Sequence, residues 1–230
     1  NGTKHFYNKP VLILDIAIKG IMNVIDACIK NKVKELYLAS SSEVYQTPIK
    51  VPTDESESLK IPDIFNPRYS YGGGKILTEL MGVHYGKKYF KKLIIFRPHN
   101  VYGKDMGNEH VVPEFINRFK SLKGKRFKIQ GSGNETRSFI YIEDFLHAFE
   151  LILMKGKHLN IYNIGTSEKI KIKDLAFKLA KIFKKKVLLK RTALAKGGTK
   201  IRLPNIQKIK SLGFKKKFNL DKGLRKTLES

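Results

Sequence analysis

Short apolar runs that predict buried strands alternate along this chain with longer segments of helical periodicity. Strands are predicted near residues 34–39, 93–96, 127–130, 137–141, 160–164 and 186–189. Helices are predicted over residues 10–31, 70–90, 112–122, 143–154 and 172–183, and after residue 221. Short apolar strands joined by helices are typical of parallel sheets that are covered on both faces. We therefore predict an α/β fold with a mainly parallel sheet.

Residues with hydroxyl groups occur at two places in this pattern that could form a catalytic site, one at the end of a predicted strand and one on a predicted helix. Ser40, Ser41 and Ser42 follow the predicted strand at residues 34–39, at the carboxyl end where such sheets open into a crevice. Tyr71 and Lys75 are four residues apart, so a helix places them on one side, where the ammonium can lower the pKa of the phenol. This spacing alone occurs by chance about once or twice in a lysine-rich chain. Its position after the serines predicts convergence on one bound molecule, with an ordinary amphipathic helix as the alternative.

Further segments follow in a fixed order. They are Ser-Ser-Ser-Glu-Val-Tyr at 40–45, Arg-Pro-His-Asn-Val-Tyr-Gly at 97–103, Val-Pro at 112–113, Gly-Ser-Gly at 131–133, Thr-Arg-Ser-Phe at 136–139, Tyr-Asn-Ile-Gly at 162–165, Leu-Gly-Phe at 212–214 and Gly-Leu at 223–224. Together with Tyr71 and Lys75, they resemble the extended short-chain dehydrogenase/reductase family, in its branch of nucleotide-sugar epimerases and dehydratases. The resemblance covers nearly the whole chain, and it is the order and spacing of the segments that make it specific.

One element of that family has no counterpart here. The family opens with a strand, a Gly-x-x-Gly-x-x-Gly turn and a helix whose amino end holds the dinucleotide pyrophosphate. No such turn occurs in the sequence, so we expect a truncated dinucleotide domain and an inactive isolated chain. By the resemblance, residues 1–103 form the end of a Rossmann-like sheet that lacks its first strands. Residues 104–230 would form mainly a smaller α/β lobe that binds the nucleotide sugar, interleaved with the last strands of the sheet.

The resemblance also implies a catalytic set and a dinucleotide cofactor, NAD, with NADP not excluded. Tyr71 corresponds to the base that removes a proton from a sugar hydroxyl, and Lys75 to the cation that holds the phenolate and the nicotinamide ribose. Ser41 corresponds to the residue that shares a hydrogen bond with that hydroxyl, although it could also be a strand-end cap. Residues expected to line the cofactor are Ala39, Ser40, Tyr71, Lys75, Arg97, Pro98 and His99. For His99, packing is the alternative role.

A nucleotide-diphosphate sugar is the implied substrate. Asn100 corresponds to a residue that hydrogen-bonds the diphosphate or the sugar, and Val112 is also expected to contact the substrate. Arg137 corresponds to the arginine that pairs with the diphosphate, a task suited to a bidentate guanidinium. A second basic contact is expected from Lys196, Lys200 or Arg202, among which the altered loop pattern does not choose. Ala17 stands where the family often has asparagine, which puts a supporting hydrogen bond in doubt.

The type of reaction depends on Glu43. Dehydratases that act on dTDP-glucose tend to carry two acids here, and the first position is Ser42. Ser-Ser-Glu is closer to the Thr-Ser-Glu of GDP-mannose dehydratases and UDP-glucuronate decarboxylases, and it also occurs in many epimerases. Glu43 would act as a general acid or base, or would orient a hydroxyl. We predict an epimerase, an isomerase that works through a transient keto-sugar, with a 4,6-dehydratase or decarboxylase as the alternative.

Composition bears on the remaining function classes. A net charge of +26 often marks proteins that bind nucleic acid or anionic membranes. Here the charge is mostly lysine and is scattered, so we expect no nucleic acid, with a non-catalytic basic scaffold that binds RNA or an acidic partner as the alternative of another class. The apolar runs are too short for a membrane span. Cys28 is the only cysteine, which excludes an intrachain disulfide and a cysteine zinc site. We expect no metal and a location in the cytoplasm.

The helices predicted over residues 10–31 and 70–90 carry more apolar residues than one sheet-facing stripe requires. The resemblance implies that these helices form a four-helix interface between two copies. We therefore expect a homodimer.

Overall fold

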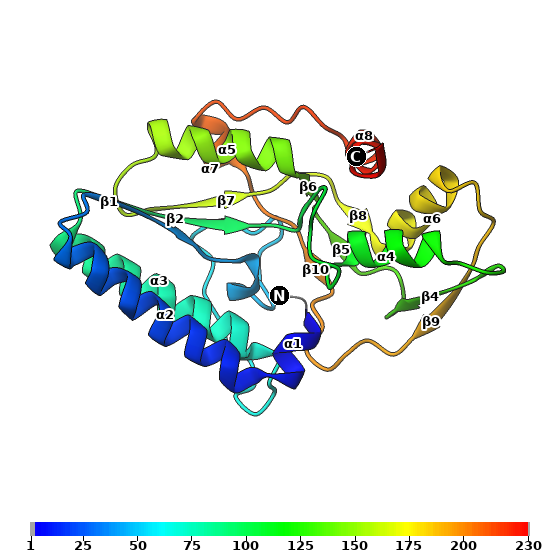
Figure 1. Cartoon of the computed structure of the whole chain (residues 1–230), viewed down its shortest axis with the longest axis horizontal. Helices are drawn as coiled ribbons and strands as arrows, with labels where there is room; N and C mark the ends of the chain where they lie inside the picture. The colour runs from blue at the N-terminus through cyan, green and yellow to red at the C-terminus, as the bar shows by residue number, and fades with distance from the viewer. Residues whose placement is uncertain (1–2, 230) are drawn as a thin grey trace.

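The computed structural model describes residues 3–229. Residues 1–2 of the predicted segment 1–103 and residue 230 of the predicted segment 104–230 therefore lie outside the described residues. Its largest body is a three-stranded parallel sheet of order β1–β2–β7, formed by β1 (Glu35–Ala39), β2 (Lys92–Pro98) and β7 (Asn160–Ile164). Helices α2 (Pro10–Lys30) and α3 (Tyr69–Tyr89) cover one face of this sheet, and α5 (Ile142–Lys155) and α7 (Gln207–Ser211) cover the other (Figure 1). The predicted α/β fold with a parallel sheet is confirmed.

Strand β2 shows why its sequence is an unbroken apolar run. Successive side chains of a strand point to opposite faces, and both faces of this strand are covered. Leu93 and Ile95 pack into the core under α2 and α3, whereas Ile94 and Phe96 pack into the core under α5 and α7. Leu93, Ile94 and Ile95 are at most 1% exposed, so the strand anchors the layers that carry the site.

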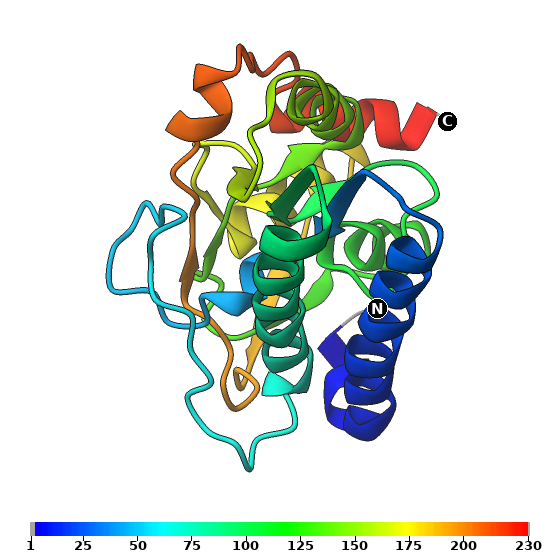
Figure 2. The ribbon, with the colours of Figure 1, turned by 90° about the vertical axis from the view of Figure 1, so that its left-hand side faces the viewer.

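Glycines let α3 lie close to its neighbours. A Cβ added at Gly74 would lie 2.5 Å from the Cβ of Ala17 on α2, and one added at Gly82 would lie 2.5 Å from Leu38 on β1. The two long helices run side by side (Figure 2). Ala17, where the resemblance led us to look for an asparagine, thus packs against the helix of Tyr71 and Lys75. The missing methyl groups bring the backbone of α3 near the sheet.

A smaller lobe lies beyond the carboxyl ends of these strands. Parallel strands β4 (Arg126–Gln130) and β9 (Leu188–Thr192) share an aromatic-rich core with α4 (Val111–Lys120), α6 (Ile172–Ile182) and α8 (Leu220–Glu229). The remaining elements are α1 (Thr3–Asn8), the 3-10 helix η1 (Ser42–Val44), β3 (Val101–Tyr102), β5 (Thr136–Arg137), β6 (Ile140–Tyr141), β8 (Ile170–Lys171) and β10 (Ile201–Arg202). Two small sheets, β10–β5–β8 and β3–β6, lie between the large sheet and this core (Figure 1).

The prediction of one continuous strand over residues 137–141 is wrong, because this segment forms two short strands, β5 and β6. β5 pairs with β10 and β8, whereas β6 pairs with β3. Ser138 lies between them, is fully buried, and bonds to the carbonyl of Thr166 through its hydroxyl. The buried hydroxyl at this break thus finds its partner 28 positions along the chain.

Candidate active site

The end of β1 and the first turns of α3 meet at one point. The hydroxyl of Ser41 caps η1 by accepting from the backbone N–H of Glu43 at 3.1 Å, and it lies near enough to Tyr71 to lower the pKa of that phenol. Lys75 donates from its ammonium to the carbonyl of Ala39 at 2.7 Å. Ser41 and Tyr71 line a cavity of about 1320 Å³ that extends into the smaller lobe. The sequence-predicted hydroxyl groups are thus brought together by the fold.

The electrostatics of Tyr71 differ from our expectation. Burial raises the pKa of the phenol, and the nearby hydroxyl of Ser41 only partly opposes this. The ammonium of Lys75 lies 5.9 Å from the centre of the Tyr71 ring and is directed to the Ala39 carbonyl, and burial lowers the pKa of Lys75. The predicted lowering of the Tyr71 pKa by Lys75 is therefore wrong for the described chain, because desolvation outweighs a charge at this distance.

Three arginines gather around Glu43, and we call Arg68, Arg137 and Arg202 the guanidinium cluster. Nη1 of Arg202 contacts Glu43 Oε1 at 2.8 Å, and Nη2 of Arg68 contacts Oε2 at 3.4 Å. Burial by itself would raise the pKa of the Glu43 carboxyl, but Arg202 and Arg68 outweigh it and hold that pKa below its usual value. Burial, reinforced by Arg202, lowers the pKa of Arg137 to about 9. The cluster therefore carries more positive charge than Glu43 compensates.

The pairing of β5 with β10 and the loop before β10 place this cluster. Arg202 stands opposite Arg137 in the register of the two strands. The carbonyl of Thr199 accepts from Arg137 at 2.8 Å, and its hydroxyl accepts from Arg202 at 3.0 Å. Gly197 has φ +84°, and a Cβ there would lie 3.0 Å from Cδ of Arg68. A residue with a side chain would be strained and crowded at this point, so glycine allows the loop to close over Arg68.

Of the three basic candidates in this loop, Arg202 is the one that reaches Glu43. Lys196 has a side chain that is 85% exposed and pairs with Asp63 at 3.7 Å, while its carbonyl accepts from Asn66 at 3.2 Å. Lys200 is exposed and lines a second, smaller cavity. The Lys196 side chain points to solvent in this structure, so the expected substrate contact from Lys196 stays a prediction.

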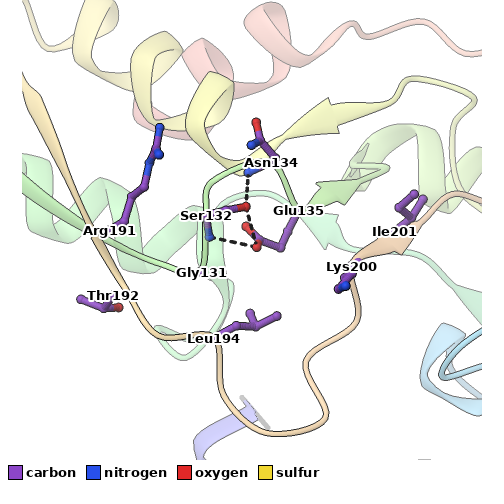
Figure 3. Close-up of a pocket in the computed structure, with 9 residues that line it drawn as sticks. All are labelled: Gly131, Ser132, Asn134, Glu135, Arg191, Thr192, Leu194, Lys200 and Ile201. Carbon is purple, nitrogen blue, oxygen red and sulfur yellow. Dashed lines mark hydrogen bonds between the residues drawn. The ribbon is translucent and has the colours of Figure 1, made fainter.

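The second cavity, of about 730 Å³, is shaped by the glycine turn at residues 131–133 (Figure 3). The carboxylate of Glu135 accepts from the backbone N–H groups of Ser132 at 3.0 Å and Gly133 at 2.8 Å, which closes the turn. Glu135, Thr192 and Leu194 line both cavities, so the smaller one adjoins the larger at these residues. The two form one elongated site.

Several predicted cofactor or substrate residues lie beneath the site. Arg97 is buried and bonds Glu79 at 2.8 and 2.5 Å and the Tyr45 hydroxyl at 2.6 Å. His99 is fully buried, with Nε2 at 3.2 Å from Asn163 Oδ1, and burial lowers its pKa to about 3. Their direct contact roles are corrected to support of the site, because the guanidinium of Arg97 and Nε2 of His99 bond to the protein interior, while Nδ1 of His99 is buried with no hydrogen-bond partner among residues 3–229. For His99, this is the packing alternative.

Val112 belongs to the core of the smaller lobe at 2% exposure, so its expected substrate contact is not made by its side chain. Pro98 and Asn100, by contrast, line the large cavity. Asn100 has φ +41° and donates to the Ser138 carbonyl at 2.8 Å. Ser40 also lines the cavity, but its hydroxyl is directed to Glu79.

Sequence reasoning missed other residues of the site. Arg68 stands one helical turn before Tyr71, and Glu79 one turn after Lys75, so helical spacing offered a signal for both. Phe6 offered no signal, yet its buried ring stacks on Tyr71 with 4.7 Å between the centroids and 4° between the planes. This contact covers one face of the phenol.

Within residues 3–229, no three His, Cys, Asp or Glu side chains come together as ligands for a metal ion. No helix of this range has both the length and the apolar character needed to cross a membrane.

A comparison with models of known protein families shows to which family this chain belongs. Residues 2–165 match the model described as NAD dependent epimerase/dehydratase family. The chain belongs to this family. It is 34% identical over 170 residues to a dTDP-D-glucose 4,6-dehydratase of Dictyostelium discoideum, which covers 72% of the chain and 39% of that protein. It is 30% identical over 217 residues to a trifunctional UDP-glucose 4,6-dehydratase/UDP-4-keto-6-deoxy-D-glucose 3,5-epimerase/UDP-4-keto-L-rhamnose-reductase of Arabidopsis thaliana, covering 92% of the chain and 32% of that protein.

Solved structures agree with the fold. A UDP-glucose 4-epimerase from Thermotoga maritima, crystallised with UDP-glucose, superposes with a TM-score of 0.88 at 27% identity, over 100% of this chain and 73% of that one. The chain therefore spans well under half the length of the two dehydratase relatives and about three quarters of this epimerase.

Proposed function

We propose that this chain supplies the nucleotide-sugar site of an NAD-dependent epimerase. The supporting observation is the order of groups along the elongated site. The hydroxyl pair of Ser41 and Tyr71 lies at one end, the guanidinium groups of Arg137 and Arg202 follow, and the cavity at the glycine turn lies at the other end. A nucleoside-diphosphate sugar has the same order, with a reactive hydroxyl, an anionic diphosphate and a nucleoside.

The residues of this site suit proton handling at a sugar hydroxyl. Ser41 would hold that hydroxyl beside the phenol of Tyr71, which would take and return its proton. Because burial raises the pKa of Tyr71, this role requires nearby positive charge, and Arg202 is the cation that lowers this pKa in the described chain. Ala39 and Pro98, at the ends of β1 and β2, together with Lys75 on α3, would hold the nicotinamide ribose side of NAD. When bound, the nicotinamide supplies the acceptor and donor of hydride that oxidises the sugar carbon and reduces it again.

The lack of a second acid beside Glu43 favours epimerisation over dehydration. Loss of water needs a proton donor for the departing hydroxyl. Glu43 is held ionised by Arg202 and Arg68, and the preceding position is Ser42. An ionised carboxylate accepts hydrogen bonds and does not donate a proton. A 4,6-dehydratase remains the second candidate, because two relatives at 34% and 30% identity carry that name.

Product analysis with UDP-glucose and NAD distinguishes these reactions. An epimerase gives a product of unchanged mass, whereas a dehydratase gives one lighter by a water molecule. In a protein that carries the complete dinucleotide domain, Tyr71→Phe should abolish turnover and leave nucleotide-sugar binding largely intact, because it removes the transferable proton but little contact area. Tyr89→Phe is the matched control, since Tyr89 is 44% exposed at the other end of α3. Near-normal turnover by Tyr71→Phe would refute the assigned base.

We also propose that the enzyme is a homodimer that works in the cytoplasm. On α2, Val11, Leu12 and Ile16 are 71%, 49% and 62% exposed, and on α3 Leu80 is 52% exposed. Two adjacent helices with apolar outer faces suit a self-complementary interface. The basic scaffold fits less well, because Ser41, Tyr71 and Asn100 line one cavity, as an enzyme requires.

A further inference from the structure

The guanidinium of Arg68 is poorly compensated for its burial. The residue is 5% exposed, and its side chain lines the large cavity. Its contact with Glu43 is long, at 3.4 Å, whereas Arg202 contacts the other oxygen of that carboxylate at 2.8 Å. Nε of Arg68 is buried and has no hydrogen-bond partner among residues 3–229. Removing a guanidinium from water is costly unless an acceptor or an anion compensates it.

Arg68 also lies at a different end of the cluster from Arg137. It immediately precedes α3, one turn before Tyr71, and it contacts Glu43, two residues after Ser41. Arg137 and Arg202 are neighbours in the β5–β10 pair, on the side of the smaller lobe. The loop at Gly197 closes over the Arg68 side chain and holds it in place. Arg68 is therefore grouped with the hydroxyl chemistry, away from the diphosphate end.

The geometry of a hexose determines what such a group meets. In a pyranose the diphosphate is attached to C1, and C4 lies across the ring. When the C4 hydroxyl lies at Ser41 and Tyr71, the neighbouring carbon C5 directs its exocyclic carbon, C6, to the same end of the sugar. A donor beside Ser41 and Glu43 is thus placed to meet an oxygen on C6, which is a hydroxyl in a hexose and a carboxylate in a hexuronate.

We propose that Arg68 is a substrate-contacting residue that determines specificity by donating hydrogen bonds to the oxygen substituent on C6 of the sugar. This inference rests on the proposed function. Arg68 and Arg202 share the carboxylate of Glu43. Because its contact with Glu43 is the longer one, the charge of Arg68 is less compensated than the charge of Arg202. A carboxylate on C6 is therefore the better ligand, since charge-assisted hydrogen bonds are the stronger ones.

Three probes isolate this contact: UDP-glucuronate has a C6 carboxylate, UDP-glucose has a C6 hydroxyl, and UDP-xylose has no C6. Their dissociation constants are measured by calorimetry on the full chain, with and without NAD. We expect UDP-glucuronate to bind about tenfold or more tightly than UDP-xylose, with UDP-glucose between them. Arg68→Gln should remove this difference and leave the affinity for UDP-xylose unchanged, which also shows that the variant is folded.

Two further variants complete the test. Arg68→Lys keeps the charge without the planar fork and should keep part of the preference for UDP-glucuronate. Arg225→Gln, on an exposed position of α8, is the matched control and should bind all three like the parent chain.

The outcomes separate this inference from the proposed function. If Arg68→Gln weakens all three nucleotide sugars equally, or weakens none, Arg68 does not read C6 and the inference is overturned while the proposed function stands. If none of the three binds to the parent chain, the proposed function fails together with the inference.

Discussion

The ion pair of Glu79 and Arg97 beneath the site allows a quantitative test. The two residues are 3% and 2% exposed and share two hydrogen bonds, at 2.8 and 2.5 Å. Glu79→Gln keeps the shape but leaves the guanidinium uncompensated in the interior. Removal of one partner from a buried pair costs about 3–5 kcal/mol of unfolding free energy. We expect a loss of this size.

Urea denaturation followed by circular dichroism measures the loss directly. A thermal scan should show a melting temperature lower by about 6–20 °C, because 1 kcal/mol corresponds to about 2–4 °C in a chain of this size. The control is Asp15→Asn, which removes an acid from an exposed pair with Lys19 at 2.9 Å. That variant should lose less than about 0.5 kcal/mol. Equal losses in the two variants would refute the reasoning.

Replacing both partners distinguishes an uncompensated charge from lost packing. Glu79→Leu combined with Arg97→Met removes both charges and keeps side chains of similar size. Such replacements of a buried pair are often neutral or stabilising. The double variant should therefore be more stable than Glu79→Gln. A double variant that is less stable would show that the hydrogen bonds of Ser40 and Tyr45 to this pair matter more than its charges.

Three other predictions concern affinity, pH and assembly. Arg137→Ala should weaken binding of UDP-glucose by about 2 kcal/mol, or about thirtyfold, through loss of a charge-assisted pair, and unchanged affinity in calorimetry would place Arg137 outside the diphosphate site. Unfolded His99 takes up a proton near 6.5, whereas burial lowers the pKa of the folded residue to about 3. Between pH 3 and pH 6.5, the protein therefore takes up a proton at His99 when it unfolds. The free energy of unfolding should fall as pH decreases from 6.5, by on the order of 2–3 kcal/mol at pH 4.5. In urea titrations His99→Asn should show a smaller fall, and an equal fall would assign the effect to other groups. Ile16→Lys on α2 should convert a dimer into a monomer in light scattering, since it places a charge in the apolar outer face, and a monomeric parent chain would refute the proposed assembly.

Local patterns made much of the fold predictable. The helix predicted over residues 10–31 is observed as Pro10–Lys30, and the apolar run at residues 93–96 lies within the buried strand β2. These elements follow from periodicity over a few turns or residues, which neighbouring side chains alone determine. Strands of two residues, such as β3 and β8, have no period to detect, so the sequence did not reveal them.

What the sequence by itself determined is the α/β architecture and the meeting of Ser41 with Tyr71, because a strand end and a helix turn are local features with a known arrangement. Only the tertiary structure decided that Arg202 reaches Glu43 across 159 positions of the chain and that Arg97 and His99 lie in the interior. It also decided that the pKa of Tyr71 is raised, where the spacing to Lys75 predicted the opposite. The reason is that burial and long-range charge pairs depend on which distant segments pack together, and spacing along the chain contains no measure of desolvation.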